Sequence, residues 1–475
     1  MSKEGNKMKS GKLQVFAALV AGLSLCGHGA DITVDFDSPT GKVKPVHAVG
    51  QGPMLGNTGF SLFRHLKEAN IPYARLHDVG GTFGGNLFVD IPNIFRNFEA
   101  DETDPANYDF TFTDLYLKAL VDNGVEPYFR LGVTIETFSR TVKAFRIFPP
   151  KDFAKWARIC EHIVRHYNEG WANGHKYNIR YWEIWNEADD YPDHRNAMWR
   201  GTWKEFCEFY DVAARHLKSK FPHLKIGGYA RCTAHSVTYE MKGKSVPEAE
   251  AYRHRCFVEF CDFIKARKSP LDFFSFHGYI EADLVKAHTD YHREHLRKAG
   301  YGDVELHLNE WMCREWLIND KTCSYWENAK LSSGIAAFLA AMQIEDDLDM
   351  AHVYDARCRL SWTSPLFNPI TRKPGKAFYA FKSFGALYAL GTAVKCEIAG
   401  GQGKDGLWAV AAKNGDRGAI FVVNDSDETR MLEFDFRGWK AKGSCLVTDA
   451  GRTDDVAEFT ALMLPRSFEL VELKR

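Results

Sequence analysis

The sequence has no excess of charge of either sign. Its 475 residues carry a formal net charge of −1, and no long basic run occurs in the chain. Proteins that bind nucleic acid or anionic membrane surfaces through electrostatics usually carry such a run. The balance therefore argues against both classes of protein, and we expect no nucleic-acid partner.

Metal-ligand patterns are also missing. None of the 11 cysteines forms a Cys-x-x-Cys pair, and no cluster of histidine, cysteine and carboxylate residues has the spacing of a metal motif. We therefore predict no metal site and no cofactor. The cysteines are interpreted as free buried thiols or, for Cys313 with Cys323, as a disulfide within one loop.

The apolar run near the N-terminus is too short for a comfortable transmembrane helix. It spans residues 13–25, follows four lysines and precedes the small residues Gly27, Gly29 and Ala30. This order is typical of a cleavable secretory signal. Residues 1–30 are therefore predicted to direct export to the periplasm, the cell surface or the medium, leaving no transmembrane segment in the mature chain. A lipid anchor at Cys26 and a retained N-terminal anchor are the alternatives.

Apolar and aromatic residues, in contrast, are plentiful. Hydrophobic residues make up 45% of the chain and aromatic residues 14%. This content supplies a full core for two to three domains, or for one large barrel with an appendix. The aromatic share also suits a sugar site, where rings lie against the apolar faces of sugars.

Two short segments carry most of the information about function. Residues 181–187 (YWEIWNE) and 304–311 (VELHLNEW) are mostly apolar or aromatic, and in each an Asn-Glu pair stands where a buried strand should end. Barrel enzymes keep their catalytic groups at such strand ends. A single strand-end glutamate is commonly just a solvated acid, but two of them meet the need of glycoside hydrolysis for a proton donor and a nucleophile or base.

Short apolar runs alternate with helical patterns through the first four fifths of the chain. Strands are predicted at residues 46–50, 73–77, 126–131, 181–186, 225–229, 273–277, 305–309 and 350–354. Eight strands alternating with helices predict an α/β fold of the closed (β/α)₈ TIM-barrel type over residues 31–385. The long segments that follow these strands are expected to surround the site.

The pattern changes after residue 385, where helical periodicity stops. Short strands are predicted at residues 407–412, 418–423, 431–436, 444–448 and 468–473, with turn signals between them. Residues 386–475 are therefore predicted to form a small β-sandwich, to which residues 31–45 add a strand.

Four motifs give the chain a resemblance to the clan A glycoside hydrolases, and within that clan to glycoside hydrolase family 39. They are RLH at 75–77, EIWNE at 183–187, SFHGY at 275–279 and LHLNEW at 306–311. The family includes β-xylosidases and α-L-iduronidases, and its barrel carries a small β-sandwich. The resemblance implies that Glu187, after the fourth barrel strand, is the general acid/base. It implies that Glu310, after the seventh, is the nucleophile.

Further site residues follow from these motifs. Arg75 is the candidate cation beside Glu310, and Tyr279 is a candidate hydrogen-bond donor to the same carboxylate. Candidate partners of the sugar hydroxyls are Asn186, His77 and His277. Candidate aromatic platforms for the sugar are Trp311, Trp185 and Trp362. Glu183 is interpreted as part of the barrel interior. For most of these residues, plain packing is the competing interpretation.

The sequence thus predicts a secreted retaining exo-glycosidase that removes a terminal sugar from an oligosaccharide or polysaccharide. The alternatives are a carbohydrate-binding protein on a degenerate barrel, a β-xylosidase proper, or an inverting hydrolase. Arg130 and Arg357 depart from the xylosidase pattern, and if they point inward they favour an acidic or differently hydroxylated sugar. The sugar, the linkage and the oligomeric state are left open.

Overall fold

The computed structural model describes residues 31–56, 61–81, 87–135, 146–192, 194–313, 325–361, 363–453, 459 and 461–475. The predicted signal at residues 1–30 and Cys323 lie outside these ranges, so the signal and the pairing of Cys313 with Cys323 stay predictions.

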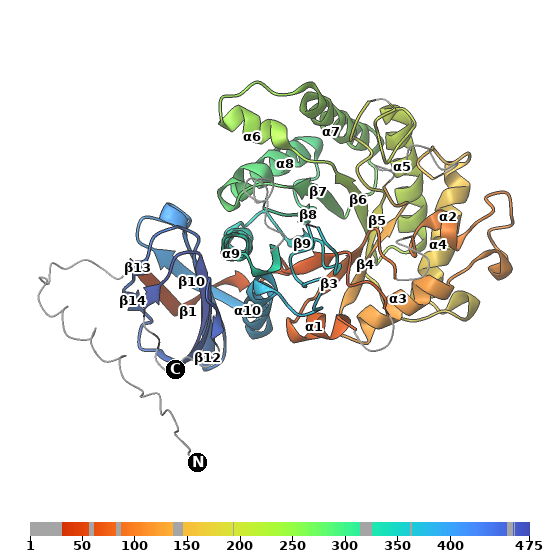
Figure 1. Cartoon of the computed structure of the whole chain (residues 1–475). Helices are drawn as coiled ribbons and strands as arrows, with labels where there is room; N and C mark the ends of the chain where they lie inside the picture. The colour runs from red at the N-terminus through yellow and green to blue at the C-terminus, as the bar shows by residue number, and fades with distance from the viewer. Residues whose placement is uncertain are drawn as a thin grey trace, which may run out of the picture.

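Eight parallel strands form a closed barrel, the right-hand body in Figure 1. Neighbouring strands pair in chain order, and the last strand pairs with the first through His352 and Ala48. The strands are β2 (Ala48–Gly50), β3 (Tyr73–Leu76), β4 (Glu126–Leu131), β5 (Tyr181–Ile184), β6 (Lys225–Arg231), β7 (Phe273–Gly278), β8 (Glu305–Trp311) and β9 (Met350–Tyr354). The predicted (β/α)₈ barrel is confirmed, and each strand overlaps the apolar run that predicted it.

Helices surround the barrel and fill the segments between its strands. In α4 (Phe153–Asn168) most apolar positions are buried, and Asp152 caps the first turn by accepting a hydrogen bond from the Lys155 amide. A capping box between Thr202 and Glu205 stabilises the first turn of α5 (Trp203–Lys220). The other helices are α1 (Phe63–Glu68), α2 (Ile91–Ile94), α3 (Thr111–Val121), α6 (His235–Met241), α7 (Glu248–Arg267), α8 (Val285–Ala299), α9 (Ala329–Ile344) and α10 (Lys376–Leu390).

Layers of side chains fill the barrel interior. The layer near the amino ends of the strands is apolar and mostly aromatic, and it consists of Ala48, Tyr73, Tyr128, Tyr181, Phe273 and Met350. Because strand side chains alternate, the residue two positions later on the same strand lies in the next layer. That layer is polar: Tyr73 is followed by Arg75, Tyr181 by Glu183 and Phe273 by Ser275, all buried. The carboxyl ends of the strands lie above it and hold the candidate site.

An eight-stranded sheet forms the second part of the molecule, at the left in Figure 1. The N-terminal strand β1 lies between β14 and β10, so the two ends of the described chain share one sheet. The sheet order is β14 (Phe434–Asp435), β1 (Ile32–Lys42), β10 (Thr392–Ile398), β11 (Leu407–Asn414), β12 (Arg417–Asn424), β18 (Ser467–Lys474), β15 (Lys440–Thr448) and β16 (Gly451–Thr453).

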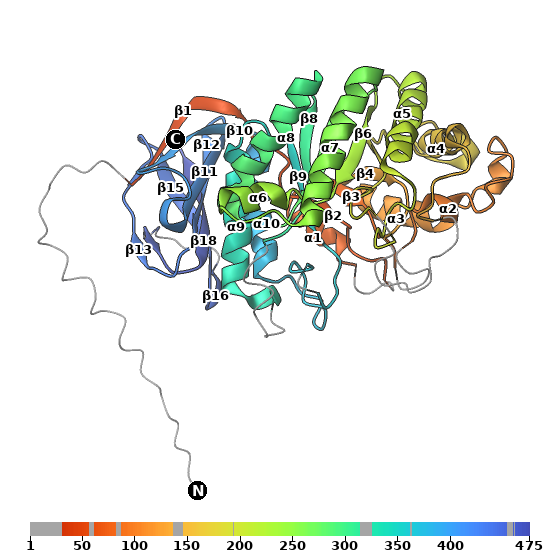
Figure 2. The same cartoon turned by 90° about the horizontal axis from the view of Figure 1, so that it is seen from above.

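This sheet is covered on both faces, which explains its continuous apolar runs. One face, with Phe421 and Val423, joins the main core through α9 and α10. The other, with Ile420 and Val422, packs beneath a two-stranded sheet of β13 (Arg430–Met431) and β17 (Leu462–Met463). Figure 2 shows α9 and α10 between the barrel and the sheet.

Three details differ from the sequence prediction. Strand β10 was missed, because its exposed Lys395 and Glu397 interrupt the apolar pattern. The strand predicted at residues 431–436 is split between β13 and β14, which belong to different sheets. Helix α10 runs to Leu390, so the predicted boundary after residue 385 falls inside a helix.

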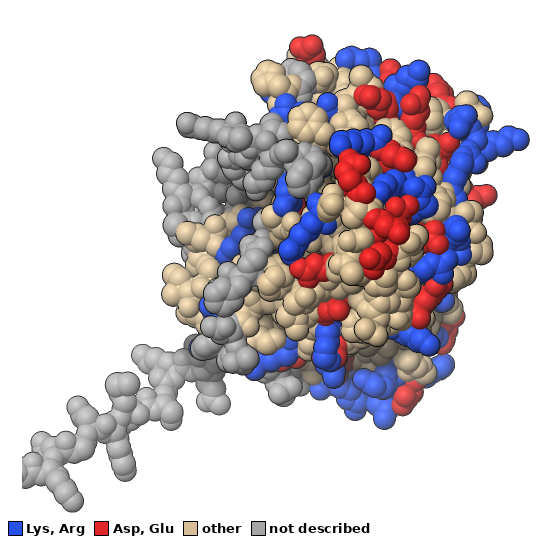
Figure 3. Space-filling view, turned by 90° about the vertical axis from the view of Figure 1, so that its right-hand side faces the viewer, with Lys and Arg blue, Asp and Glu red and all other residues tan. Residues whose placement is uncertain are grey.

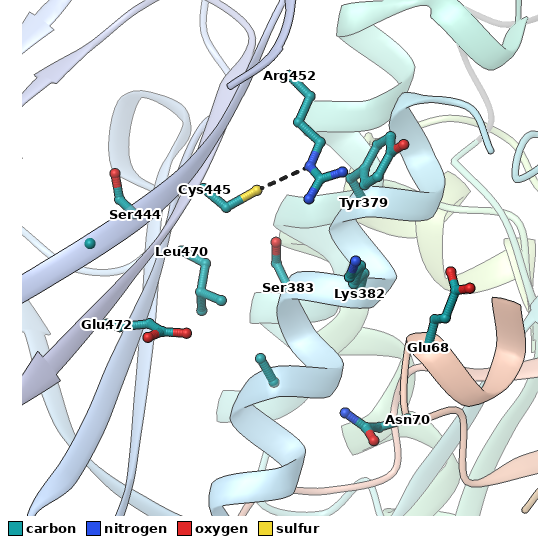
Figure 4. Close-up of a pocket in the computed structure, with 12 residues that line it drawn as sticks. Glu68, Asn70, Tyr379, Lys382, Ser383, Ser444, Cys445, Arg452, Leu470 and Glu472 are labelled. Carbon is teal, nitrogen blue, oxygen red and sulfur yellow. Dashed lines mark hydrogen bonds between the residues drawn. The ribbon is translucent and has the colours of Figure 1, made fainter. Parts of the chain in front are cut away.

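A cavity of about 380 Å³ lies where the sheet meets α10 (Figure 4). Arg452 lies over the ring of Tyr379 there, 4.3 Å from its centroid, and donates to the sulfur of Cys445. No lining residue comes from a barrel strand, so this cavity is a feature of the junction and not of the strand ends.

Basic and acidic side chains are intermixed on the face shown in Figure 3, in line with the balanced charge of the sequence. Within the part of the chain that is described, no helix has both the length and the apolar character needed to cross a membrane.

Candidate active site

The first Asn-Glu pair follows β5 after a sharp change in the backbone. The strand ends at Ile184, and the φ angles of Trp185 and Glu187 are 71° and 43°. Residues with a side chain seldom adopt this region unless surrounding contacts hold them, and such positions are frequent at functional sites. The turn leaves Glu187 at the barrel mouth, within hydrogen-bond distance of His277 on β7.

A β-bulge in β8 places both residues of the second Asn-Glu pair, Asn309 and Glu310, on the inner side of the barrel. The register between β7 and β8 shifts after Phe276, and His277 lies opposite Glu310. Asn309 donates to Glu183 inside the barrel, while Glu310 faces His277. A bulge therefore brings two consecutive residues of β8 to the same side, which regular alternation does not allow.

His277 lies between the two glutamates. Its Nδ1 is 2.8 Å from Glu187 Oε1, and its Nε2 is 3.6 Å from Glu310 Oε2. An oxygen of each carboxylate and a ring nitrogen of His277 all lie within 4.8 Å of one another. Carboxyl groups about 5–5.5 Å apart are typical of retaining glycosidases, whereas inverting enzymes separate them by about 6.5–9.5 Å to admit a water. The close approach fits the retaining geometry.

The surroundings of Glu187 favour its protonated form. Burial, together with the nearby carboxylate of Asp190, raises the pKa of Glu187 to about 7 against the opposing charge of Arg253. Arg253 donates to Asp190 at 2.6 Å. The Glu187 side chain remains 14% exposed. A carboxyl group that keeps its proton near neutral pH, and that solvent still reaches, can act as a general acid.

The surroundings of Glu310 supply donors. Tyr279 Oη donates to Oε1 at 2.5 Å, and Arg75 Nη1 donates to Oε2 at 3.3 Å. Burial raises the pKa of Glu310, and Glu187 adds to the rise, while His277, Arg75 and the Tyr279 hydrogen bond lower it. These donors favour the ionised carboxylate that a nucleophile requires. The structure places Arg75 and Tyr279 beside Glu310, as the sequence predicted.

Glu183 organises the layer beneath the site. It accepts hydrogen bonds from Arg75 Nε at 2.7 Å, Ser275 Oγ at 2.6 Å and Asn309 Nδ2 at 2.5 Å. The side chain is fully buried, so these three donors replace the water that the carboxylate loses. Its interpretation as barrel interior agrees with these contacts. Sequence reasoning assigned no role to Ser275 or Asn309, although both lie in the quoted motifs.

Two predicted sugar partners have polar atoms available. Arg75 Nη2 donates to Asn186 Oδ1 at 2.6 Å, and among the described residues the Nδ2 of Asn186 has no partner. The buried Nδ1 of His77 likewise meets no partner in the described ranges. Burial keeps the pKa of His77 well below its usual value, so the ring is neutral. Both atoms fit contacts with sugar hydroxyls, whereas His277, predicted as a third, lies between the carboxylates.

The predicted aromatic platforms need correction. Trp311 is fully buried and stacks on Phe338 of α9, with ring centroids 4.6 Å apart, because the bulge turns it to the outer face of β8. Trp185 is also buried and donates its indole N–H to the carbonyl of Met198. Neither ring contacts the carboxylate cluster, so both are packing residues. Trp362 lies outside the described residues.

Arg130 and Arg357 both lie inside the protein, but each is matched by a carboxylate. Arg130 is fully buried with Nη2 3.4 Å from Asp90 Oδ1, while its Nε and Nη1 have no partner among the residues described. Arg357 donates to Asp355 at 2.9 Å and is 5% exposed. Both arginines therefore form buried ion pairs and not salt bridges on the outer surface.

The fold also assembles groups of potential metal ligands that spacing along the chain did not reveal. One consists of Glu187, His277 and Glu310, and another of Asp114, His166 and His175. In both groups the ligand atoms lie within 4.8 Å of one another. The prediction that no metal site exists used sequence spacing alone, which does not detect ligands that come from separate elements.

Comparisons with known proteins agree with this geometry. Residues 32–305 match the family described as glycosyl hydrolases family 39. A β-xylosidase of Geobacillus stearothermophilus is 26% identical over 220 residues, which are 45% of this chain and 39% of that protein. A β-xylosidase of Caldicellulosiruptor saccharolyticus is 25% identical over 286 residues, 58% of this chain and 51% of that protein. The chain thus spans about half or less of the length of these curated relatives.

Solved structures share the whole fold. A glucosidase from Croceicoccus marinus aligns with a TM-score of 0.70 at 20% identity, covering 94% of this chain and 99% of that one. A β-xylosidase from Caulobacter crescentus aligns with a TM-score of 0.61 at 18% identity and the same coverage. At these identities the likeness concerns the fold alone.

Proposed function

The chain belongs to glycosyl hydrolases family 39, and from this membership we propose that it is a retaining exo-glycosidase acting on a terminal sugar of an oligosaccharide or polysaccharide. The observation that carries the proposal is the close pair of Glu187 and Glu310, with carboxylate oxygens within 4.8 Å. A non-catalytic sugar-binding barrel has no need of two adjacent buried carboxyl groups, one beside Asp190 and the other held by donors from Tyr279 and Arg75.

The reaction proceeds in two displacements. Glu310 attacks the anomeric carbon while Glu187 donates its proton to the glycosidic oxygen, and the leaving alcohol departs from a covalent glycosyl-enzyme. Glu187, now ionised, takes a proton from water, whose oxygen attacks the same carbon and releases Glu310. The sugar therefore keeps its anomeric configuration. Asn186 Nδ2 is the donor to the hydroxyl beside the reacting carbon.

Two variants test the assignment through different signatures. Glu310→Ala should abolish turnover, and added azide should restore part of it with the opposite anomeric product. Glu187→Ala should slow substrates with poor leaving groups far more than activated aryl glycosides, because these need no proton. Wild-type turnover in either variant contradicts the roles. An intact protein that binds sugars but hydrolyses none supports the sugar-binding alternative.

The sugar is proposed from the charges around the site. Arg130 is a buried cation close to His77, and among the described residues its Nε and Nη1 have no partner. Burial lowers the pKa of His77, and Arg130 lowers it further. We expect weak turnover of a β-xyloside and better turnover of another terminal glycoside, such as a galactoside, an arabinoside or a uronide. The curated relatives, which are named β-xylosidases, support the second candidate, a β-xylosidase proper. A panel of aryl glycosides decides between them by kcat/KM.

Export is proposed from the charged, apolar and small-residue order of residues 1–30. The test is N-terminal sequencing of the protein recovered from the cell and from the medium. A new N-terminus near residue 30 supports a cleaved signal, a lipid-modified Cys26 supports the anchor, and an intact Met1 in the cytoplasm contradicts export.

A further inference from the structure

Three residues from separate elements meet on the helical layer outside the barrel. Asp114 lies in the first turn of α3, His166 in the last turn of α4, and His175 just beyond the turn η2 (Trp171–Asn173). The Nε2 of His166 is 3.0 Å from Asp114 Oδ1, and the Nε2 of His175 is 3.5 Å from the same oxygen. All three atoms lie within 4.8 Å of one another.

The hydrogen bonds around His166 indicate which ring nitrogen carries the hydrogen when the ring is neutral. Nδ1 lies 2.9 Å from the carbonyl oxygen of Trp171, so Nδ1 carries the hydrogen that it donates there. In a neutral ring, Nε2 is then a lone-pair acceptor that faces the carboxylate of Asp114. Two acceptors 3.0 Å apart need a cation between them, either a second proton on the ring or a metal ion. A second imidazole nitrogen facing the same oxygen favours the metal ion.

We propose that Asp114, His166 and His175 form a binding site for a divalent transition-metal ion, with Zn²⁺ as the ion that the ligands fit best. Two imidazoles and one carboxylate are a common zinc-ligand set, with a water in the fourth position. Bonds of about 2.0–2.2 Å at tetrahedral angles place neighbouring ligand atoms roughly 3.3–3.6 Å apart. The observed separation of 3.5 Å lies in that range, and the separation of 3.0 Å is slightly shorter.

The groups behind the ligands hold them in place. Tyr167 Oη donates to Asp114 Oδ1 at 2.9 Å, and the Trp171 carbonyl fixes the tautomer of His166. Carbonyl and hydroxyl partners of this kind accompany most metal-binding histidines and carboxylates. The ring of His166 stacks on Phe110 at 3.5 Å and 6°, and that of His175 stacks on Tyr177 at 4.5 Å and 10°.

The backbone that presents His175 is also constrained. Ala172 and Asn173 have φ angles of 56° and 57°, which residues with side chains seldom adopt. The His175 amide donates to the carbonyl of His166, at 2.6 Å. The Asp114 and His175 side chains are 32% and 28% exposed, so an ion can enter from solvent. The bound ion would join α3, α4 and the segment that leads into β5, which stabilises the fold.

The test uses the full protein, freed of any histidine tag, and ZnCl₂ as the probe. Isothermal titration after chelator treatment should show one equivalent bound at this site. Excess Zn²⁺ should raise the Tm by roughly 2–6 °C, because the ion binds the folded state only. His175→Gln should lose this equivalent and the Tm shift. The matched control His162→Gln, one turn earlier on α4, should keep both.

The catalytic carboxylates are a second place where zinc can bind. Glu310→Gln removes one ligand of that group. This variant should still bind the zinc equivalent that is lost in His175→Gln, and it should still show the Tm shift. The outcome therefore does not depend on the proposed hydrolase activity. Equal zinc binding by wild type and His175→Gln overturns the proposal. So does a wild-type protein that binds no zinc, which would mean that a second proton holds His166 and Asp114 together.

Discussion

The protonation state of Glu187 depends on the charges around its carboxyl group. Its pKa is raised to about 7 by burial and by Asp190. The acid form is required for the first step, so activity should fall as the pH rises through about 7. Asp190→Asn removes the neighbouring negative charge and the carboxylate that pairs with Arg253 Nη2, while Arg253 Nη1 keeps its ion pair with Glu250. Both changes favour the ionised form of Glu187, and the alkaline limb of the kcat/KM profile should move to lower pH.

The pH profile of Asp190→Asn is compared with that of Asp122→Asn, which removes an exposed carboxylate paired with Lys118 on α3. This control should have the wild-type profile. An alkaline limb that stays in place in Asp190→Asn, or moves to higher pH, contradicts the electrostatic account of Glu187.

The phenol of Tyr279 has a separate effect on the nucleophile. Its hydrogen bond lowers the pKa of Glu310. Tyr279→Phe should therefore raise that pKa and move the acid limb of the profile to higher pH. A hydrogen bond to a charged group contributes about 1.5–3 kcal/mol, which corresponds to a loss of roughly 10- to 100-fold in kcat/KM. Tyr301→Phe is the control, since that hydroxyl donates to the backbone carbonyls of Ile264 in α7 and of Ser269 between α7 and β7, at a distance from the site residues.

At the scale of elements, Glu183 joins four barrel strands. It lies on β5 and accepts from residues of β3, β7 and β8. Glu183→Ala leaves three buried donors, including the Arg75 cation, without their acceptor. Removing one partner of a buried ion pair costs about 3–5 kcal/mol, so the Tm and the denaturant midpoint should fall strongly.

Glu187→Gln is the matched comparison on the same segment. The variant removes the Glu187 carboxyl group, whose pKa is higher in the folded than in the unfolded protein. Above neutral pH the carboxyl group is ionised in both states, and its burial then lowers the free energy of unfolding. This variant should keep or raise the Tm at pH 8, while losing general-acid function. Equal stability of Glu183→Ala and wild type would show that the three hydrogen bonds do not hold the strands.

The strands could be predicted because burial on both faces requires continuous apolar runs, such as residues 418–423. The details of the strand ends could not be predicted from the sequence. The bulge in β8 depends on the register with β7, and only that register explains why Glu310 faces inward and Trp311 outward. Ser275 and Asn309 were missed for the same reason, since their partner Glu183 lies on another strand. Sequence motifs predicted the reacting residues, but contacts between strands determine the surroundings of those residues.

At the scale of the whole molecule, the barrel and the eight-stranded sheet share one apolar core. Phe421 on β12 is fully buried on the face that meets the helices. Its ring lies 6.4 Å from that of Phe384 on α10 and 5.8 Å from that of Phe468 on β18. The sheet therefore covers apolar surface of α9 and α10 that the barrel alone would expose to water.

Phe421→Ala tests whether the two parts unfold together. Removing a buried phenylalanine costs about 3–5 kcal/mol through lost contacts and the cavity left behind. Because this side chain joins both parts, the denaturant midpoints followed by circular dichroism and by loss of turnover should fall together. Phe434→Ala, on the short strand β14 and only partly buried, should lower them less. A fall in the circular-dichroism midpoint with an unchanged turnover midpoint would show that the barrel keeps its active site without support from the sheet.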